Sequence, residues 1–95
     1  MKLSELEIGM LLKCTENPNI VCKVIDIYDS LNDTLGADLE FYLGGYTVSK
    51  YISSVHLTPS ISVEVTINDE TFQFSTFSNI NCEVIDEIEF RLLTS

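Results

Sequence analysis

The residues that carry out most enzyme chemistry are few in this sequence. It contains one histidine, His56, in a predicted turn beside Pro59, and three cysteines, Cys14, Cys22 and Cys82. A nucleophilic mechanism needs a nucleophile next to a base, often in a motif such as G-x-S-x-G, and no such motif occurs. None of the cysteines lies in a basic or helix-start context that would activate its thiol. We therefore predict a protein without catalytic residues.

Metal and cofactor motifs are also absent from the sequence. Cys14 and Cys22 are too far apart for a zinc knuckle. Residues 29–40 have the length of an EF-hand loop, but Leu31 and Thr34 replace the ligand at position three and the glycine at position six. The glycines form no phosphate-binding motif. We predict no metal and no cofactor, and we leave open a weak cation site in residues 29–40.

The balance of charges excludes whole classes of partner. Fifteen Asp and Glu residues against five Lys and Arg residues give a formal net charge of -10. Because affinity for nucleic acids and anionic membranes comes largely from clustered Lys and Arg side chains, the sequence predicts binding to neither. A basic protein surface is the electrostatic complement of such a chain. A purely solubilising role for the acids stays open.

The acidic residues are concentrated near the end of the sequence, in the predicted strand 82–92. Alternate residues of a strand project to one face, about 6.6 Å apart, so several carboxylates would form a row that imitates phosphates. Acids from neighbouring turns would extend this row. The predicted partner-binding residues are Glu83, Glu87, Glu89, Glu64, Asp69 and Glu70.

Cysteine number and the N-terminal residues predict a cytoplasmic protein, located in the host cytoplasm if a virus encodes it. Residues 1–7 form neither a basic nor an apolar signal region, and an odd number of cysteines is typical of reduced thiols. Apolar runs are far shorter than the ~20 residues that cross a bilayer. If residues 17–19 form a three-residue hairpin loop, Cys14 lies opposite Cys22, and the redox state of this pair stays open.

Period-two alternation of apolar and polar residues dominates the chain and predicts strands. Between two of the predicted strands, the pair Gly44-Gly45 is typical of a two-residue hairpin turn, which places Phe41 opposite Val48. A turn near residues 68–70 places Phe72 opposite either Val65 or Ile67. The predicted strands cover residues 10–16, 20–29, 39–43, 46–52, 61–67, 71–77 and 82–92.

These elements predict one all-β domain over residues 1–95, a small antiparallel barrel or sandwich of about seven strands built from consecutive hairpins. The only helix expected is a short N-terminal turn at Ser4-Glu5-Leu6-Glu7, which has the spacing of a capping box. In the last strand, Asp86 and Ile85 break the alternation, which we interpret as a bulge or an inward charge that protects an edge.

The leading functional hypothesis is a non-catalytic acidic protein that docks on a basic protein surface and blocks or regulates it. Small acidic chains of this type include virus- or mobile-element-encoded inhibitors of host nucleic-acid enzymes, an argument from type. One alternative is a structural or adaptor domain that associates, with itself or another protein, through a sheet edge or an exposed aromatic face. Candidate residues for that face are Tyr28, Tyr42, Tyr51 and Phe77. Another alternative is a small-ligand or metal-binding β-barrel.

Overall fold

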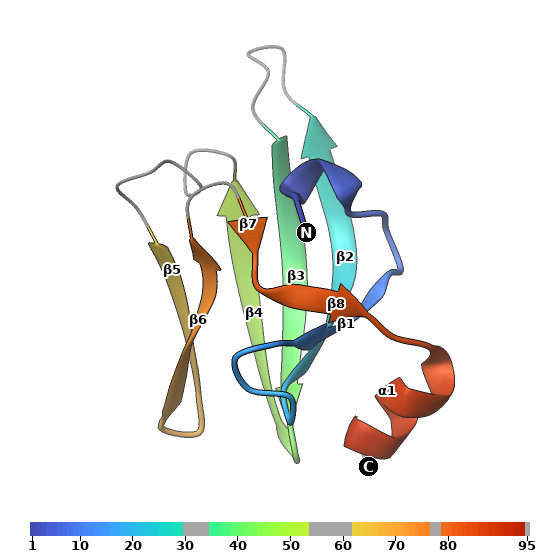
Figure 1. Cartoon of the computed structure of the whole chain (residues 1–95), viewed down its shortest axis with the longest axis vertical. Helices are drawn as coiled ribbons and strands as arrows, with labels where there is room; N and C mark the ends of the chain where they lie inside the picture. Colours follow the sequence, from blue (N-terminus) through green and yellow to red (C-terminus); the bar gives the residue numbers. More distant parts are fainter. Residues whose placement is uncertain (30–34, 54–61, 77–78, 95) are drawn as a thin grey trace.

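The computed structural model describes residues 1–29, 35–53, 62–76 and 79–94 (Figure 1). Within these residues the chain forms two antiparallel sheets, with strand order β4-β3-β2-β1-β8 in sheet A and β5-β6-β7 in sheet B. A short 3₁₀ helix, η1 (Leu3–Glu5), precedes the strands and a helix, α1 (Glu87–Thr94), follows them. The strands are β1 (Leu11–Cys14), β2 (Val21–Asp29), β3 (Leu35–Leu43), β4 (Tyr46–Ser53), β5 (Ser62–Ile67), β6 (Glu70–Thr76), β7 (Asn79–Ile80) and β8 (Cys82–Val84).

The predicted all-β, antiparallel class is confirmed. The described residues form eight strands rather than about seven, because the short strand β7 precedes β8. They form two sheets and no closed barrel. Consecutive hairpins build β1 to β4, as expected, whereas β8 returns to pair with β1 and completes sheet A.

The core lies between the facing sides of the two sheets. The ring of Phe41, on β3, packs edge-on against Phe72 and Phe74 of β6, with ring centroids 5.9 and 4.9 Å apart. Burial of a large apolar side chain contributes about 1.5–3 kcal/mol, so this contact contributes strongly to holding the sheets together. Other buried members of the core are Leu3, Leu6, Leu12, Cys14, Ile20, Cys22, Val24, Ala37, Leu39, Ile52, Val63, Val65, Ile67, Ile80 and Cys82.

Two hairpin registers follow from their turns. Across β3 and β4, Phe41 lies opposite Val48 as predicted, and Gly44 has the positive φ of 58° that such a turn requires. Between β5 and β6, Asn68 and Asp69 have φ angles of 49° and 66°. These two residues therefore form the turn, and of the two open registers the structure has the one with Val65 opposite Phe72.

The register predicted for the first hairpin is wrong by two residues. Leu12, not Cys14, lies opposite Cys22, and Cys14 lies opposite Cys82 of β8. The connecting loop is longer than three residues, since the Cys14 amide donates to the carbonyl of Ile20 at 2.9 Å. A shift of two residues leaves every side chain on its predicted face because strand side chains alternate with period two.

The second half of the predicted strand 82–92 is a helix, so the expectation of a single N-terminal helical turn was wrong. Strand β8 ends at Val84, and α1 begins at Glu87. The Asp86 carboxylate accepts a hydrogen bond from the Glu89 amide at 2.8 Å, which is the geometry of a helix N-cap. The interruption at Asp86 therefore marks the start of a helix, not a bulge in a strand.

The helices of the described chain lie beside the sheets. The predicted N-terminal turn is present as η1, but the predicted cap is wrong, because Ser4 lies inside the helix and the N-cap is Lys2. The Lys2 amide donates to the Glu5 carboxylate at 3.3 Å, and Leu3 and Leu6 are buried. At the other end, α1 packs on strands β1, β2 and β3 of sheet A, on the side away from sheet B. Among the described residues, neither helix has the length and apolar character needed to cross a membrane.

A bulge in β2 determines which side chains reach the outer face of sheet A, the face away from sheet B. Between Val24 and Asp26 the register with β3 shifts by one residue, and the extra residue is Ile25. Beyond the bulge Ile27 packs against the core, whereas Asp26 and Tyr28 lie on the outer face. Part of this face is covered by α1 and the remainder is open.

Candidate interaction surface

The structure separates the six predicted partner-binding acids into two groups. Glu83 lies on β8, with Glu87 and Glu89 on α1, so these three do not form a row along one strand. The other three belong to the β5–β6 hairpin of sheet B. No hydrogen bond or ion pair joins the two groups within the described ranges. The second group consists of Glu64 on β5, Asp69 in the turn and Glu70 at the start of β6.

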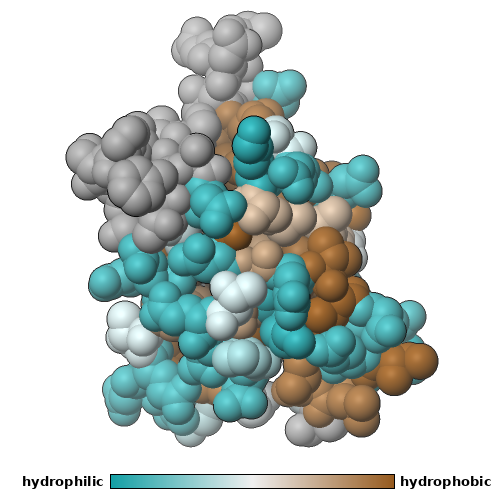
Figure 2. All heavy atoms as spheres, in the orientation of Figure 1, coloured by the Kyte–Doolittle hydropathy of each residue, from teal (hydrophilic) through white to brown (hydrophobic). Residues whose placement is uncertain are grey.

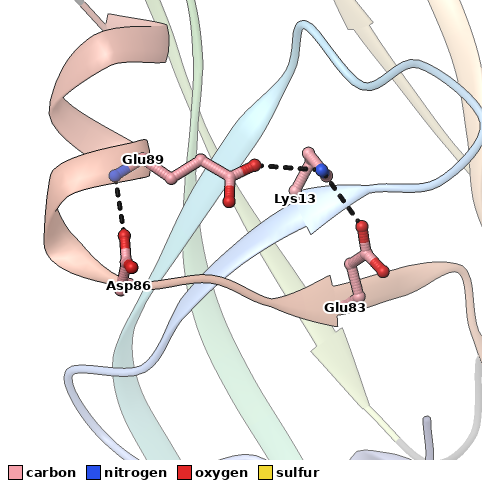
Figure 3. A network of polar contacts seen from close by, with 4 residues as sticks. All are labelled: Lys13, Glu83, Asp86 and Glu89. Atoms are coloured by element: carbon pink, nitrogen blue, oxygen red, sulfur yellow. Dashed lines mark hydrogen bonds and ion pairs between the residues drawn. The ribbon is translucent and has the colours of Figure 1, made fainter.

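Lys13 neutralises much of the first group (Figure 3). Its ammonium nitrogen lies 3.1 Å from a Glu83 oxygen and 2.9 Å from a Glu89 oxygen. The hydrogen bonds to Glu89 and Glu83 raise the pKa of Lys13 above its ordinary value. The same Glu89 is fixed at its backbone by the Asp86 cap. This network joins α1 to the sheet, and its single ammonium offsets only part of the negative charge of Glu83, Glu89 and Asp86.

Glu87 forms an ion pair along the helix. Its carboxylate lies 2.6 Å from a guanidinium nitrogen of Arg91, one turn later. Both side chains are exposed, so the pair is screened by solvent and contributes little to stability. All three acids of the first group therefore have a cation as neighbour.

The second group has no such neighbour. Glu64, Asp69 and Glu70 are exposed, and no lysine or arginine of the described chain forms an ion pair with them. Glu70 accepts a hydrogen bond from the Asn17 amide group at 3.2 Å, which joins the hairpin to the β1–β2 loop. These three carboxylates face solvent without a cation beside them in the described chain.

A further group of acids, which the sequence analysis did not select, lies on the open part of the outer face of sheet A. Asp26 of β2 and Asp38 of β3 lie directly opposite each other. Like charges in directly opposed positions destabilise a sheet. Neither carboxylate has a cationic partner among the residues the structure describes. Residues 21–27 have apolar side chains at both odd and even positions, and this was the one sign of the arrangement in the sequence. The pattern conceals a bulge, which changes which residues point to the outer face.

Two tyrosines adjoin these aspartates. The Tyr28 hydroxyl donates to an Asp38 carboxylate oxygen at 2.6 Å, and the rings of Tyr28 and Tyr51 have centroids 6.1 Å apart. The hydrogen bond to Asp38, with smaller effects of burial and the charge of Asp26, raises the pKa of Tyr28 to about 12. Gly36 leaves room for this position of the Tyr51 ring, because a Cβ atom at residue 36 would lie 2.3 Å from the Tyr51 hydroxyl.

The third described aromatic residue of the predicted exposed face, Tyr42, is placed differently. Tyr42 packs edge-on against Phe90 of α1, with centroids 5.5 Å apart, and hydrogen-bonds to Glu40. Burial, then the hydrogen bond to Glu40, raises the pKa of Tyr42 to about 12. Phe77 lies outside the described residues. Of the three described members of the predicted set, Tyr28 and Tyr51 are brought together.

Apolar side chains are exposed on α1 as well. Figure 2 shows hydrophobic atoms gathered over the helix at lower right, where Ile88 and Leu92 are each 72% exposed. They are four residues apart and therefore share one side of the helix, the side opposite to Phe90. Val84, 57% exposed, precedes the helix on β8.

The three thiols are buried and form no disulfide in the structure. Cys14, Cys22 and Cys82 are free and lie in the core. The hydrogen bond with Cys14 and burial raise the pKa of Cys22 well above its ordinary value, and burial raises that of Cys82 to about 12. No cluster of three potential metal ligands occurs in the described ranges. His56 and residues 30–34 of the EF-hand-like segment fall outside them.

Comparisons with protein-family models, with curated proteins and with solved structures find no match to this chain.

Proposed function

We propose that this protein is a non-catalytic acidic binding protein, which docks on a basic surface of another protein and blocks or regulates it. The observation that supports this most strongly is the placement of its few cations. Of the five basic residues, only Lys13 and Arg91 form ion pairs in the described chain, and their three pairs lie around α1. The acids of the β5–β6 hairpin and of the β2–β3 face form no ion pair with a described lysine or arginine.

Such a surface would act by steering and by complementarity. A net charge of -10 on a small domain attracts a basic surface over a distance set by the ionic strength. Carboxylates held on paired strands lose little conformational freedom when they bind, because the backbone that carries them is already ordered. A groove that normally receives nucleic-acid phosphates is a suitable target, and a virus- or mobile-element-encoded inhibitor of a nucleic-acid enzyme is the form of the proposal that we favour.

The buried thiols support the non-catalytic part of the proposal. A thiol attacks as its thiolate, and the raised pKa values of Cys22 and Cys82 oppose ionisation near neutral pH. Their places in the core also keep substrates away. The protein would therefore act by occupying a surface and not by modifying it.

The test begins with capture on the immobilised protein from a lysate of the encoding organism, and continues with a purified candidate partner. We expect the Kd for the reconstituted pair to rise steeply between low and moderate salt. Binding that is indifferent to salt, or no reconstitution with any basic protein, would contradict the proposal.

Two matched triple variants locate the charges that contribute. One removes the helix-side group, Glu83→Gln, Glu87→Gln and Glu89→Gln. The other removes the hairpin group, Glu64→Gln, Asp69→Asn and Glu70→Gln. Both lose three negative charges, but only the second loses charges that lack a cationic neighbour, so we expect it to weaken binding more.

A second candidate function, a structural or adaptor domain, is supported by the apolar side of α1. Ile88 and Leu92 are exposed side chains of a kind usually buried. Sedimentation velocity over a range of protein concentrations tests self-association, and an Ile88→Ser/Leu92→Ser double variant is the control. A monomer at every concentration would remove association with itself.

A further inference from the structure

The open part of the outer face of sheet A combines negative charge with exposed aromatic and apolar surface. Ile25 and Tyr28 are each 44% exposed and Tyr51 is 48% exposed, although side chains of this size are usually covered. A shallow groove of about 310 Å³ lies beside them. It is lined by Ile25, Asp38, Leu39, Glu40, Ser49, Lys50 and Tyr51.

The aspartates supply charge in a fixed position. Asp26 and Asp38 are paired residues of adjacent strands, and an Asp26 oxygen accepts from the Ile27 amide at 2.9 Å while an Asp38 oxygen accepts from Tyr28. These hydrogen bonds orient the carboxylates without neutralising them. Since opposed like charges destabilise a sheet, a cation placed between them would relieve a cost that the folded protein carries.

The tyrosines supply a surface for a flat cation. Their ring planes meet at 56°, and each ring has a π face that attracts positive charge within about 6 Å of its centroid. The bulge at Ile25 and the absence of a side chain at Gly36 are both needed for this arrangement. The two features bring a carboxylate pair and an aromatic pair to one place.

Of the two basic side chains, arginine fits this combination better than lysine. Its guanidinium group is planar, donates two parallel hydrogen bonds to a carboxylate and stacks on aromatic rings, whereas the lysine ammonium is a compact and strongly hydrated point charge. A partner that presents only lysines would gain the charge attraction but not the stacking.

We propose that Asp26, Tyr28, Asp38 and Tyr51, here called the tyrosine–aspartate patch, receive an arginine side chain of the basic partner protein. This inference rests on the proposed function and names the chemistry of the contact. The β5–β6 hairpin and the α1 region then contribute general attraction, and the patch contributes the preference for arginine.

An NMR titration of the whole protein with an arginine homopeptide and a lysine homopeptide of equal length tests the patch. We expect the arginine peptide to bind more tightly and to shift backbone amide signals of residues 25–28, 36–38 and 50–52. An Asp26→Asn/Asp38→Asn variant should raise the Kd for the arginine peptide about tenfold, which corresponds to about 1.4 kcal/mol. The matched control, Glu64→Gln/Glu70→Gln, loses the same charge elsewhere and should raise it much less.

A third variant tests the aromatic part without changing any charge. Gly36→Ala places a methyl group where the Tyr51 ring lies, and the ring can move because it is an exposed side chain. We expect this variant to stay folded, to keep salt-sensitive binding of both peptides and to lose the preference for arginine. Tyr46→Ala, which removes an exposed tyrosine at the β3–β4 turn, is its control.

The outcomes separate this inference from the proposed function. Equal affinity for both peptides, or signal shifts confined to α1 or to the β5–β6 hairpin, would overturn the patch while leaving an acidic docking protein intact. Absence of binding to either peptide at low salt would also overturn the patch. The proposed function fails independently if no reconstituted basic partner binds in a salt-dependent manner.

Discussion

Lys13 and Glu89 are 76 residues apart in the chain, and their side chains meet at 2.9 Å on the outer face of sheet A. The same lysine binds Glu83, so one ammonium group joins β1 to both β8 and α1. This contact explains why the acids near the end of the chain do not form a free negative row. Glu83 and Glu89 instead join β8 and α1 to Lys13 of β1.

Removal of the lysine charge should loosen α1. In Lys13→Met, Glu83 and Glu89 lose their common cation, and we expect a small decrease in the urea midpoint and faster amide hydrogen exchange in residues 87–94. Lys23→Met is the control, because Lys23 is exposed and forms no ion pair with any described residue. Equal effects of the two variants would show that the ion pairs around Lys13 do not hold the helix.

The N-cap of α1 contributes to stability independently of the Lys13 ion pairs. Asp86→Ala removes the hydrogen bond to the Glu89 amide and should lower the free energy of unfolding by about 1 kcal/mol. Asp86→Ser keeps an oxygen in the capping position and should lower it much less. Urea unfolding followed by circular dichroism measures both, and equal losses would contradict the assignment of Asp86 as the cap.

One aromatic ring of sheet A, that of Phe41, contacts both phenylalanines of β6. Phe41 is fully buried against Phe72 and Phe74, so Phe41→Ala should lower the free energy of unfolding by about 3–5 kcal/mol. Tyr46→Ala removes an exposed ring from the neighbouring strand and should change stability little. A loss below about 1 kcal/mol in the Phe41 variant would show that the sheets are not held together there.

The pH dependence of Tyr28 reports the charge of its surroundings. Its pKa is raised from 10.0 to about 12, first by the hydrogen bond to Asp38. A raised folded-state pKa stabilises the protein below pH 10, where the tyrosine is neutral, and this contribution is lost as the pH rises from 10 to 12. In Asp38→Asn the pKa should fall toward 10. The tyrosine Cζ signals in a ¹³C NMR titration measure this, with Glu64→Gln as a variant that should change nothing.

The cysteines should resist modification while the protein is folded. All three thiols are buried and free of disulfides in the structure, and the raised pKa values of Cys22 and Cys82 disfavour their thiolates. We expect almost no reaction with a thiol reagent at pH 8 in the native state and reaction of three thiols in denaturant. Rapid labelling of the native protein would contradict the placement of these residues in the core.

The sequence was sufficient for the class of the fold and for the hairpins whose turns have a strong chemical signature. Gly44-Gly45 determined one register, because a two-residue turn that needs a positive φ angle, here at Gly44, admits few alternatives. The loop between Cys14 and Cys22 lacks such a signature, so its register was wrong by two residues. The alternation of apolar and polar residues alone does not distinguish strand registers that differ by an even number of residues.

The helix was missed for a local reason. Residues 82–92 alternate well enough for a strand, but Asp86 followed three residues later by Glu89 is a capping signal, and the structure uses the Asp86 side chain in this way. The tyrosine–aspartate patch was missed because a bulge moves the following side chains to the opposite face of the strand, and nothing in the amino-acid composition marks it. Alternation before Ile25 assigns Asp26 and Tyr28 to the core side, and only the register with β3 shows otherwise.

The pairing of β1 with β8 also affects how the protein is made. A ribosome adds about 5–20 residues per second, so β1 emerges several seconds before the strand and the helix that complete its sheet. During that interval one edge of β1 has open backbone groups, and the apolar side chains that α1 will cover remain in contact with water. The native state therefore becomes accessible only after α1 has been synthesised, and a nascent-chain complex stalled before residue 82 is expected to stay incompletely folded and to bind chaperones.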